Sequence, residues 1–425
     1  MDTNTAKKHA LKLIEQASSL SDSAVMDLLN RTVAHNYKVI SDDPVVRAEG
    51  VWLYTRRGRK LFDGVAAYSA ANFGHGHPLM KEAIRLFLES GAPEVLGRFL
   101  PDPWLALLGE RITNLTGFEN FLPVNGGVEA PETAVKLARR WAWQVKKVHQ
   151  PEIIFAGHCW HGRTITMTQM FDEDDNAGRD GFGPFPPGFV RVPFNDLAAI
   201  AKAITPKTAA IMLEPVQGEG GINIPDQGYL AAVAQIAREN KLLTIWDEIQ
   251  TGWARTGKLF CWMHEGDAAK PDIVCVGKSL SGGFGPVAGI LARREIMSLF
   301  GPGSHGSTFG GSPFSSMLGV AALAVYEHEE IGKRATETGN WLRPRLEAIA
   351  KKAASIKEVR SRGMMFGIEF KRTGKDATTY AKKLLELGVV AKDTHGWVLR
   401  FTPPLTATHE ELEYALEIME KAFVA

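Results

Sequence analysis

Short apolar runs alternate with stretches of helical periodicity through the middle of the chain. The apolar runs are Thr208–Pro215, Leu242–Glu248 and Asp272–Gly277, and apolar residues recur at helical spacing over Asp226–Asn240. Short buried strands separated by amphipathic helices are typical of βαβ units, whose strands are parallel. The pattern therefore predicts an α/β protein with a mostly parallel sheet flanked by helices.

The segments on either side of this region extend the pattern. Residues 119–147 read as a strand, a glycine turn and then a helix. Downstream, Phe314–His328 and Arg334–Ala353 have helical spacing, and residues 359–370 and 395–404 have the composition of strands. Two helices followed by strands indicate a separate α+β unit at the carboxyl end.

The length of 425 residues exceeds what one hydrophobic core usually serves, so two structural domains are expected. The element pattern divides the chain into an N-terminal helical arm at 1–50, a large domain at 51–315 and a smaller α+β domain at 316–425. The site is expected in the large domain, where the parallel strands lie.

Composition narrows the class of protein. Hydrophobic residues make up 45% and charged residues 23%, and the net charge of +1 gives no reason to expect nucleic acid or an anionic membrane as partner. The three cysteines have no metal-ligand spacing and fit free thiols in a reducing compartment. The first residues lack the apolar stretch of a signal peptide. We therefore expect a cytoplasmic enzyme.

Polar residues stand where the predicted parallel strands end. Glu214 and Asp247 close two apolar runs, Gln250 follows shortly after, and Lys278 comes one glycine beyond a third. In open α/β sheets, ligands bind outside the carboxyl ends of the strands. A charge beside a buried strand is costly unless it is paired or functional, so two interpretations stand.

One interpretation is a structural ion pair between Asp247 and Lys278. The other is a cofactor that needs an amine and a carboxylate together, as pyridoxal phosphate does: lysine forms a Schiff base with its aldehyde, and a carboxylate keeps its ring nitrogen protonated. Its phosphate could bind at the glycine turn "NGGVEA" (Asn125–Ala130), which opens a helix, and at "HGSTFGG" (His305–Gly311). Each segment alone could equally be an ordinary turn.

Competing ligand motifs fail on their spacing. "GKS" (Gly277–Ser279) lacks the earlier glycine of a P-loop, because Asp272 stands there. "GFGPVA" (Gly283–Ala288) contains a proline and is not followed by a clear helix, which argues against a dinucleotide site. The two histidines of "GHGHP" (Gly74–Pro78) lack further ligands, so no metal is expected.

Several longer motifs, taken together, resemble the class III pyridoxal-phosphate aminotransferases of fold type I. They are "DEIQTGWARTG" (Asp247–Gly257), "GKSLSGG" (Gly277–Gly283) and "HGSTFGG". Within that class, "YSAAN" (Tyr68–Asn72), "HGRT" (His161–Thr164), "DGFGPFPPGF" (Asp180–Phe189) and "KDTHGWVLRFTPP" (Lys392–Pro404) resemble the branch that acts on ornithine. The similarity runs from Ala34 to Pro404. It implies pyridoxal 5'-phosphate as cofactor and a homodimer with shared active sites.

The resemblance also implies roles for the residues that would hold the cofactor. Lys278 would form the Schiff base and carry the proton, and Asp247 would pair with the ring nitrogen. The other expected contacts are Gln250 at the ring hydroxyl, the N–H groups of Gly127 and Val128 at the phosphate, Trp160 stacked on the ring, and Thr308 at the neighbouring subunit's phosphate. The ornithine branch usually has Phe then Trp where this chain has Trp160 then His161.

Substrate roles follow from the same resemblance. Arg163, with Tyr37, would hold the α-carboxylate of ornithine and later the side-chain carboxylate of 2-oxoglutarate. Arg400 would hold the α-carboxylate of 2-oxoglutarate, because arginine grips carboxylates in two-pronged fashion. Glu219 would neutralise Arg400 while ornithine reacts, and Tyr68 would line the pocket that selects ornithine.

The implied activity is transfer of the δ-amino group of L-ornithine to 2-oxoglutarate by a ping-pong cycle. An N-acetylornithine or lysine ε-aminotransferase, or an amino-acid racemase, would share Lys278, Asp247 and the phosphate site. A noncatalytic ligand-binding protein that has kept the fold is an alternative from another class, against which the intact Lys278 and Asp247 argue. Small-molecule amino acids and oxo acids are the expected partners.

Overall fold

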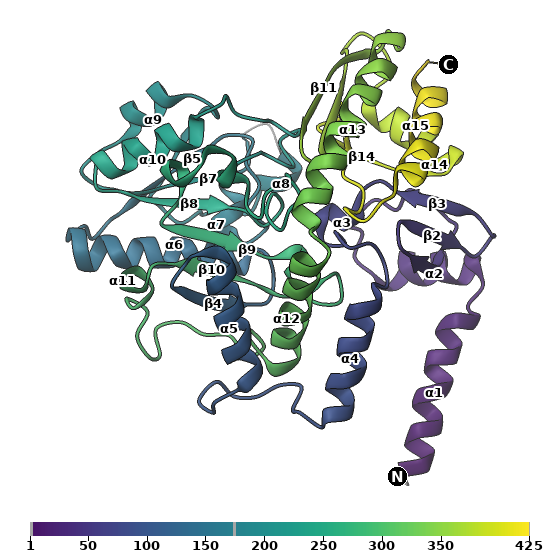
Figure 1. Ribbon diagram of the computed structural model, residues 1–425, viewed down its shortest axis with the longest axis horizontal. Coiled ribbons are helices and arrows are strands. Elements are labelled where there is room, and N and C mark those ends of the chain that lie inside the picture. Colours follow the sequence, from purple (N-terminus) through teal and green to yellow (C-terminus); the bar gives the residue numbers. More distant parts are fainter. Residues whose placement is uncertain (1–2, 173–175, 425) are drawn as a thin grey trace.

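The computed structural model describes residues 3–172 and 176–424. Its largest sheet has seven strands in the order β4-β10-β9-β8-β7-β5-β6, and β10 is the one strand that runs against its neighbours (Figure 1). The strands are β4 (Asn120–Val124), β5 (Glu152–Ala156), β6 (Phe189–Val192), β7 (Thr208–Leu213), β8 (Leu243–Asp247), β9 (Ile273–Val276) and β10 (Ala288–Ala292). The predicted α/β fold with a mostly parallel sheet is confirmed.

Helices cover both faces of this sheet, as the continuous apolar runs require. Along β5, Ile153 and Phe155 pack into the cluster that includes α6 (Glu129–Trp141), while Ile154 packs into the cluster on the other face. The second cluster includes residues of α5 (Pro103–Thr116), α10 (Tyr229–Glu239) and α12 (Pro313–His328). Each fully buried aliphatic side chain contributes roughly 1.5–3 kcal/mol, so the strands are held from both sides.

The carboxyl-terminal part forms a separate antiparallel sheet in the order β11-β12-β15-β14, at the upper right of Figure 1. Its strands are β11 (Ile356–Arg362), β12 (Met365–Phe370), β14 (Lys392–Thr394) and β15 (Val398–Phe401), and the helices beside it are α13 (Ile331–Lys352), α14 (Ala377–Leu387) and α15 (His409–Val424). The domain boundary predicted after residue 315 falls inside α12, which packs against α5 and α4 (Pro78–Ser90).

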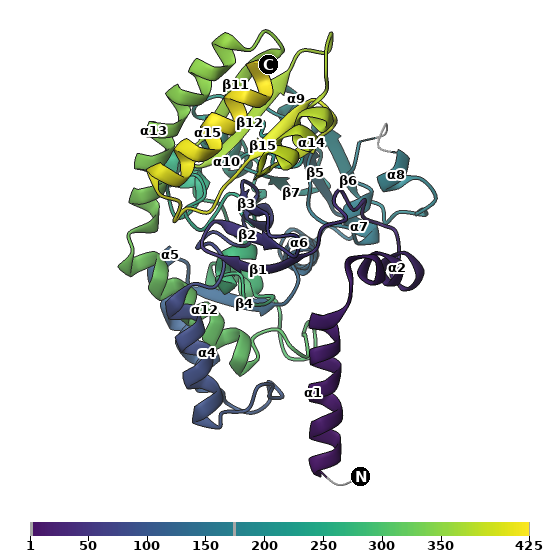
Figure 2. The same cartoon turned by 90° about the vertical axis from the view of Figure 1, so that its right-hand side faces the viewer.

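The N-terminal segment is helical only in part. It forms α1 (Thr3–Ser19) and α2 (Asp22–Thr32), but β1 (Val45–Glu49) then pairs antiparallel with β2 (Trp52–Thr55). The prediction of a helical arm to residue 50 is therefore wrong over its last residues, because Val45–Glu49 complete a sheet. That sheet continues through β3 (Lys60–Asp63) to β13 (Val389–Val390), so it joins distant parts of the chain. In Figure 2, α1 projects away from the rest of the molecule.

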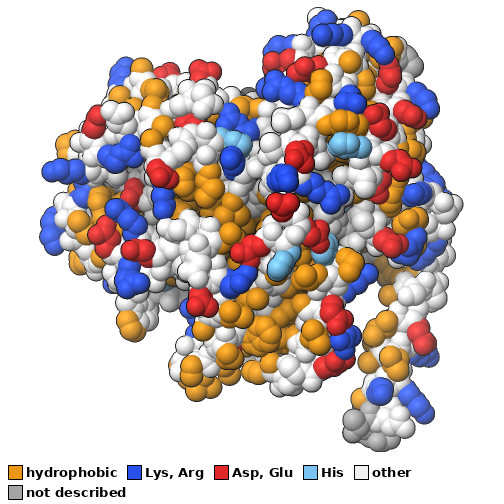
Figure 3. Space-filling view, in the orientation of Figure 1, with side chains coloured by type: hydrophobic (Ala, Val, Ile, Leu, Met, Phe, Trp, Pro, Cys, Tyr) orange, Lys and Arg blue, Asp and Glu red, His pale blue; other side chains and the backbone are white. Residues whose placement is uncertain are grey.

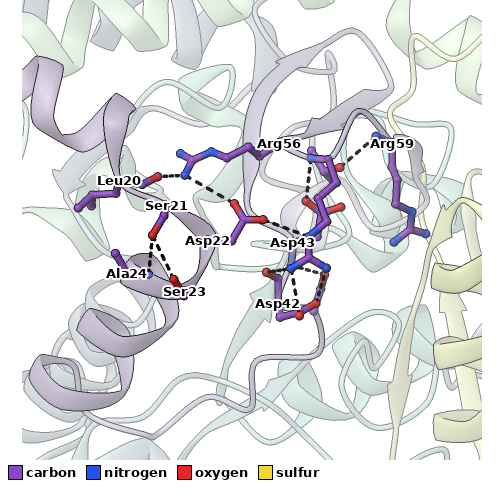
Figure 4. A network of polar contacts seen from close by, with 12 residues as sticks. Leu20, Ser21, Asp22, Ser23, Ala24, Asp42, Asp43, Arg56 and Arg59 are labelled. Atoms are coloured by element: carbon purple, nitrogen blue, oxygen red, sulfur yellow. Dashed lines mark hydrogen bonds and ion pairs between the residues drawn. The ribbon is translucent and has the colours of Figure 1, made fainter.

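Polar contacts hold the start of α2 against the turn between β2 and β3 (Figure 4). The side chain of Ser21 caps the helix by accepting a hydrogen bond from the Ala24 N–H at 3.2 Å. Asp22 forms ion pairs with Arg56 at 3.6 Å and with Arg57 at 3.0 Å. These contacts fix the start of α2 relative to that turn.

Shorter helices complete the fold. They are α3 (Ala66–Ser69), α7 (Ile165–Thr168), α8 (Asn176–Arg179), α9 (Leu197–Ala203), α11 (Arg294–Met297), three 3₁₀ turns (Cys261–Glu265, Asp267–Ala269 and Lys278–Ser281) and one π-helical turn (Ala142–Lys146) that extends α6. Among the helices of 3–172 and 176–424, none is long and apolar enough to cross a membrane. All three cysteines are free, as predicted, and the structure buries them.

Candidate active site

A cavity of about 420 Å³ opens at the carboxyl ends of β7, β8 and β9. Six of the predicted site residues line it: Gly127, Val128, Trp160, Asp247, Gln250 and Lys278. Glu214 and His161 line it as well. The strand ends therefore bring together the charged residues that the sequence pattern pointed to.

Lys278 lies in this cavity with an unengaged amine. It follows β9 after one glycine, and its φ of 49° lies in the left-handed region that side chains rarely adopt. Burial lowers the pKa of the Lys278 amine below its ordinary value, although Glu219, Asp247 and Glu214 oppose that shift. Throughout the described chain, no hydrogen-bond or ion-pair partner reaches its Nζ. An amine that has no partner and a lowered pKa is suited to act as a nucleophile.

A buried polar network holds the turn that carries Lys278. The Ser279 hydroxyl lies 2.6 Å from the Tyr326 hydroxyl and accepts a hydrogen bond from Asn72 Nδ2 at 3.0 Å. Arg255, fully buried, donates to Asn72 Oδ1 at 2.6 Å and to the Pro403 carbonyl at 2.7 Å. Sequence reasoning missed this support, because the partners are distant along the chain and carry no local motif.

Asp247 pairs with His161 rather than with Lys278. The imidazole Nδ1 lies 2.7 Å from Asp247 Oδ2, and the other carboxylate oxygen accepts the Ile249 N–H at 3.1 Å. Burial opposes a charge on His161, but Cys159 and Asp247 favour it and hold its pKa well above the ordinary value. The alternative of an Asp247–Lys278 ion pair is therefore wrong. The Asp247 carboxyl group is thus held by His161 while it still lines the cavity.

Gly162 makes this pairing possible. Its φ of 116° is open only to glycine, and a Cβ there would lie 2.2 Å from Cγ2 of Val128. The tight turn sends His161 inward to Asp247 and leaves Arg163 exposed on the other side. The sequence shows Trp160 and His161 where the ornithine branch usually has Phe and Trp. It did not predict that His161 would pair with Asp247.

Glu214 is a second buried carboxyl group in the cavity. Burial and the Asp247 carboxylate raise the pKa of Glu214 to about 7, although His161 offsets part of that shift. Its oxygens accept the Trp160 N–H at 2.7 Å and the Gly218 N–H at 3.2 Å. Glu214 thus holds the backbone at Trp160 in place.

The glycine turn before α6 forms an open cradle of N–H donors. Glu129 accepts hydrogen bonds from the N–H groups of Asn125 and Gly126, at 3.3 and 3.0 Å. The N–H groups of Gly127 and Val128 donate to no acceptor in residues 3–172 or 176–424. Two free donors at the positive end of a helix dipole suit a phosphate. The second glycine segment lies alongside, with Ser307 Oγ 2.8 Å from Asn125 Nδ2.

Arg400 and Glu219 form an ion pair, as the resemblance implied. Arg400 is only 3% exposed and lies with its guanidinium carbon 5.0 Å from the centre of the Tyr68 ring, while the side chain of Glu219 is 27% exposed. Tyr68 belongs to four successive residues of positive φ, Ala66–Ser69. Such a left-handed turn costs roughly 1–2 kcal/mol per residue, and it sets the tyrosine against the arginine.

Arg163, Tyr37 and Thr308 lie outside the lining of the cavity. The guanidinium carbon of Arg163 lies 4.6 Å from the centre of the Trp160 ring, which itself stacks on Phe171 at 4.8 Å. Tyr37 is 71% exposed and Thr308 is exposed, so this single chain does not bring either to the cavity.

Together these groups match what pyridoxal phosphate requires. The site offers an unpaired amine of lowered pKa, a buried carboxyl group held by His161, an aromatic ring and a cradle of N–H donors that suits a dianion. In a mostly parallel sheet covered on both faces, with a smaller α+β unit beside it, this set defines an α/β enzyme built around that cofactor.

Comparison with known proteins agrees with this class. A model of the family described as "Aminotransferase class-III" matches residues 32–423, so the chain belongs to the class III aminotransferase family. It is 41% identical over 399 residues to an ornithine aminotransferase of Brevibacillus brevis, covering 93% of this chain and 96% of that one. It is 42% identical to that of Oceanobacillus iheyensis, covering 95% and 99%. The cofactor is pyridoxal 5'-phosphate, and the protein is an aminotransferase.

Solved structures give the same result for the fold. An ornithine aminotransferase of Toxoplasma gondii, described with pyridoxal phosphate partly occupying its active site, superposes with a TM-score of 0.91 at 32% identity over 100% of this chain and 98% of that one. An acetylornithine aminotransferase of Elizabethkingia anophelis gives a TM-score of 0.84 at 36% identity over 95% and 99%. The fold is fold type I of the pyridoxal-phosphate enzymes.

Proposed function

We propose that the protein transfers the δ-amino group of L-ornithine to 2-oxoglutarate, giving glutamate 5-semialdehyde and L-glutamate by a ping-pong cycle. The observation that carries this proposal is the ion pair between buried Arg400 and half-buried Glu219 near Lys278, because Glu219 can either neutralise Arg400 or leave it free to bind a carboxylate. The ornithine aminotransferases that are 41% and 42% identical over most of the chain support the substrate.

In the first half-reaction, ornithine must present its distal amine and keep its α-carboxylate away from the centre. With Arg400 neutralised by Glu219, the inner position does not attract a carboxylate. We assign the α-carboxylate to the exposed Arg163, whose guanidinium carbon lies 4.6 Å from the centre of the Trp160 ring. Tyr68, over the Arg400 guanidinium, limits the space for the chain between the two ends.

In the second half-reaction, 2-oxoglutarate brings two carboxylates. Its α-carboxylate takes Arg400 after Glu219 has turned toward solvent, to which that side chain is already 27% exposed. Its side-chain carboxylate takes Arg163. Two cations at different depths therefore let one site accept a δ-amine and an α-keto acid in turn.

Bound pyridoxal phosphate supplies an electron sink that acidifies the carbon carrying the reacting nitrogen. We assign to Lys278 Nζ the anchoring of the cofactor and the movement of that proton, since this amine is unpaired and burial lowers its pKa. We assign to Asp247 the ring nitrogen, with His161 fixing the carboxylate. Gly127 and Val128 would hold the phosphate, Gln250 the ring hydroxyl and Trp160 the ring face.

We further propose a homodimer, in which Thr308 reaches the partner's phosphate. Thr308 is exposed beside Phe309, which is 59% exposed, and Phe99 is 88% exposed. Figure 3 shows hydrophobic side chains gathered over the lower part of the molecule, the region of α4, α5 and α12. Apolar patches of this kind mark association surfaces. The cytoplasm is the location we propose, since the three free thiols suit a reducing compartment.

A product assay tests the proposed function. The protein is mixed with pyridoxal phosphate, 2-oxoglutarate and L-ornithine, and pyrroline-5-carboxylate, the cyclised δ-product, is trapped. N-acetylornithine and L-lysine are offered in parallel. We expect trapped product from ornithine above turnover of the other two donors. Faster turnover of N-acetylornithine or lysine would assign the enzyme to another substrate, and no turnover of any donor would contradict an aminotransferase role.

A further inference from the structure

A second cavity lies at the opposite edge of the large sheet from the candidate active site. Its volume is about 910 Å³, against about 420 Å³ for the first. It is bounded by the end of α6, by Glu152 at the start of β5 and by the residues just before β6 and β7. Pockets of this size commonly hold small molecules. Nothing in the proposed reaction uses it.

The cavity is lined by cations that lack carboxylate partners. Arg139, Arg140 and Lys207 face it, and none of them forms an ion pair in the part of the chain that the structure describes. The one acidic side chain in the lining, Glu152, accepts a hydrogen bond from the Thr205 hydroxyl at 2.7 Å. Three cations against one engaged carboxylate leave a positive pocket, which favours an anion.

Arg139 is held in place by two contacts, but one of its N–H donors lacks an acceptor among the described residues. One of its terminal nitrogens donates to the Pro187 carbonyl at 2.5 Å, and its guanidinium carbon lies 4.9 Å from the centre of the Phe189 ring. Its Nε is buried and has no hydrogen-bond partner among residues 3–172 and 176–424. Burial lowers the pKa of this guanidinium, which Glu132 only partly offsets. Arg139 therefore adds a positive charge to the lining of the cavity that no carboxylate in the described residues pairs with.

A flat aromatic surface stands beside these cations. Trp143 is 55% exposed and packs edge-on against His149, with ring centres 5.9 Å apart. It lies in the π-helical turn Ala142–Lys146, a backbone irregularity that occurs often at functional sites. An exposed indole next to arginines provides the combination that stacks a planar base and grips its phosphate.

We propose that this cavity binds a nucleoside phosphate, with its phosphate groups on Arg140 and Lys207 and its base against Trp143. The same helix serves both sites, since the first turn of α6 adjoins the cofactor cradle and its last turn carries Arg139 and Arg140. Its thirteen residues place the two ends about 20 Å apart. The proposal does not depend on which amino acid the enzyme accepts.

The test is calorimetric titration of the cofactor-loaded protein with ATP, AMP and inorganic phosphate. Bound pyridoxal phosphate fills the active-site cradle, so that nucleotides cannot bind there. We expect ATP and AMP to bind more tightly than phosphate. The double variant Arg140→Gln/Lys207→Gln should weaken ATP binding by about tenfold or more, since it removes both cations assigned to the phosphate groups. Trp143→Leu should weaken AMP binding but not phosphate binding.

The matched control is Arg294→Gln/Lys351→Gln, which removes one arginine and one lysine that are exposed and lie outside the cavity. This control should bind ATP as the unaltered protein does, and turnover should be unchanged in all variants. Absence of ATP binding would overturn the proposal, as would equal loss in both double variants. Phosphate that binds as tightly as AMP would reduce the cavity to a plain anion site and overturn the role of Trp143.

Discussion

The replacement Glu219→Gln gives the most informative perturbation of the candidate site. In the structure, Glu219 neutralises Arg400, whose side chain is 3% exposed and has no other carboxylate partner in the described residues. Glutamine keeps the size of the side chain and removes its charge. Arg400 is then free to bind the α-carboxylate of any amino acid that enters.

The expected change in kcat/KM follows from the Arg400–Glu219 contact, which the α-carboxylate of a substrate must displace. A hydrogen bond to a charged group contributes roughly 1.5–3 kcal/mol, and the 27% exposure of the Glu219 side chain argues for the lower end. About 1.5 kcal/mol corresponds to roughly tenfold in kcat/KM. We therefore expect L-glutamate to react about tenfold faster with the variant. Ornithine should react more slowly at its δ-amine, because its α-carboxylate is drawn to Arg400.

The assay is the amino-donor half-reaction, followed through the cofactor absorbance in single turnovers without 2-oxoglutarate. The ratio of kcat/KM for ornithine to that for glutamate should fall by about tenfold or more. The control Glu420→Gln removes a carboxylate on α15 that is 41% exposed and pairs with Lys352 at 2.6 Å, and it should leave the ratio unchanged. Equal changes for both donors in Glu219→Gln would refute the reasoning.

Three further predictions follow from the structure, two for the candidate site and one for the buried carboxyl group of Glu248. Lys278→Ala should abolish the borohydride-reducible link between protein and cofactor, and a link that persists at another lysine, found by peptide mass, would refute the assignment. Asp247→Asn should lower kcat by about a hundredfold or more while the cofactor stays bound, and near-normal turnover would exclude its role at the ring nitrogen. Burial raises the pKa of Glu248 to about 7, so the folded state holds a proton there that the unfolded state has lost above pH 4.5. Stability should therefore fall as pH rises from about 4.5 to 7, by up to about 3 kcal/mol, and Glu248→Gln should flatten this slope in denaturant titrations against pH.

The central sheet could be predicted because its strands are buried on both faces. Thr208–Leu213 and Ile273–Val276 are continuous apolar runs, and such runs fix a strand without any tertiary information. Because parallel strands end at the same edge of the sheet, Asp247 at the end of β8 and Lys278 after β9 come together there. By contrast, β13 was not predicted, because it has only two residues and so leaves no periodic signal. Its partner β3 lies more than 300 residues away in the chain.

Contacts between distant residues could not be predicted from spacing. His161 and Asp247 are 86 positions apart, and only the turn at Gly162 brings the imidazole inward. The resemblance implied the Arg400–Glu219 pair, which the structure forms across 181 positions. It also implied that Tyr37 contacts substrate, which remains a prediction because the residue stands exposed in this single chain.

The most direct test of the proposed function is to follow the nitrogen itself. L-ornithine labelled with heavy nitrogen at the δ position is incubated with the cofactor-loaded protein and 2-oxoglutarate, and the glutamate formed is analysed by mass spectrometry. Transfer of the δ-amine predicts glutamate that carries the label, in amounts equal to the trapped pyrroline-5-carboxylate. Unlabelled glutamate would show that the α-amine is transferred and would contradict the masking of Arg400 by Glu219.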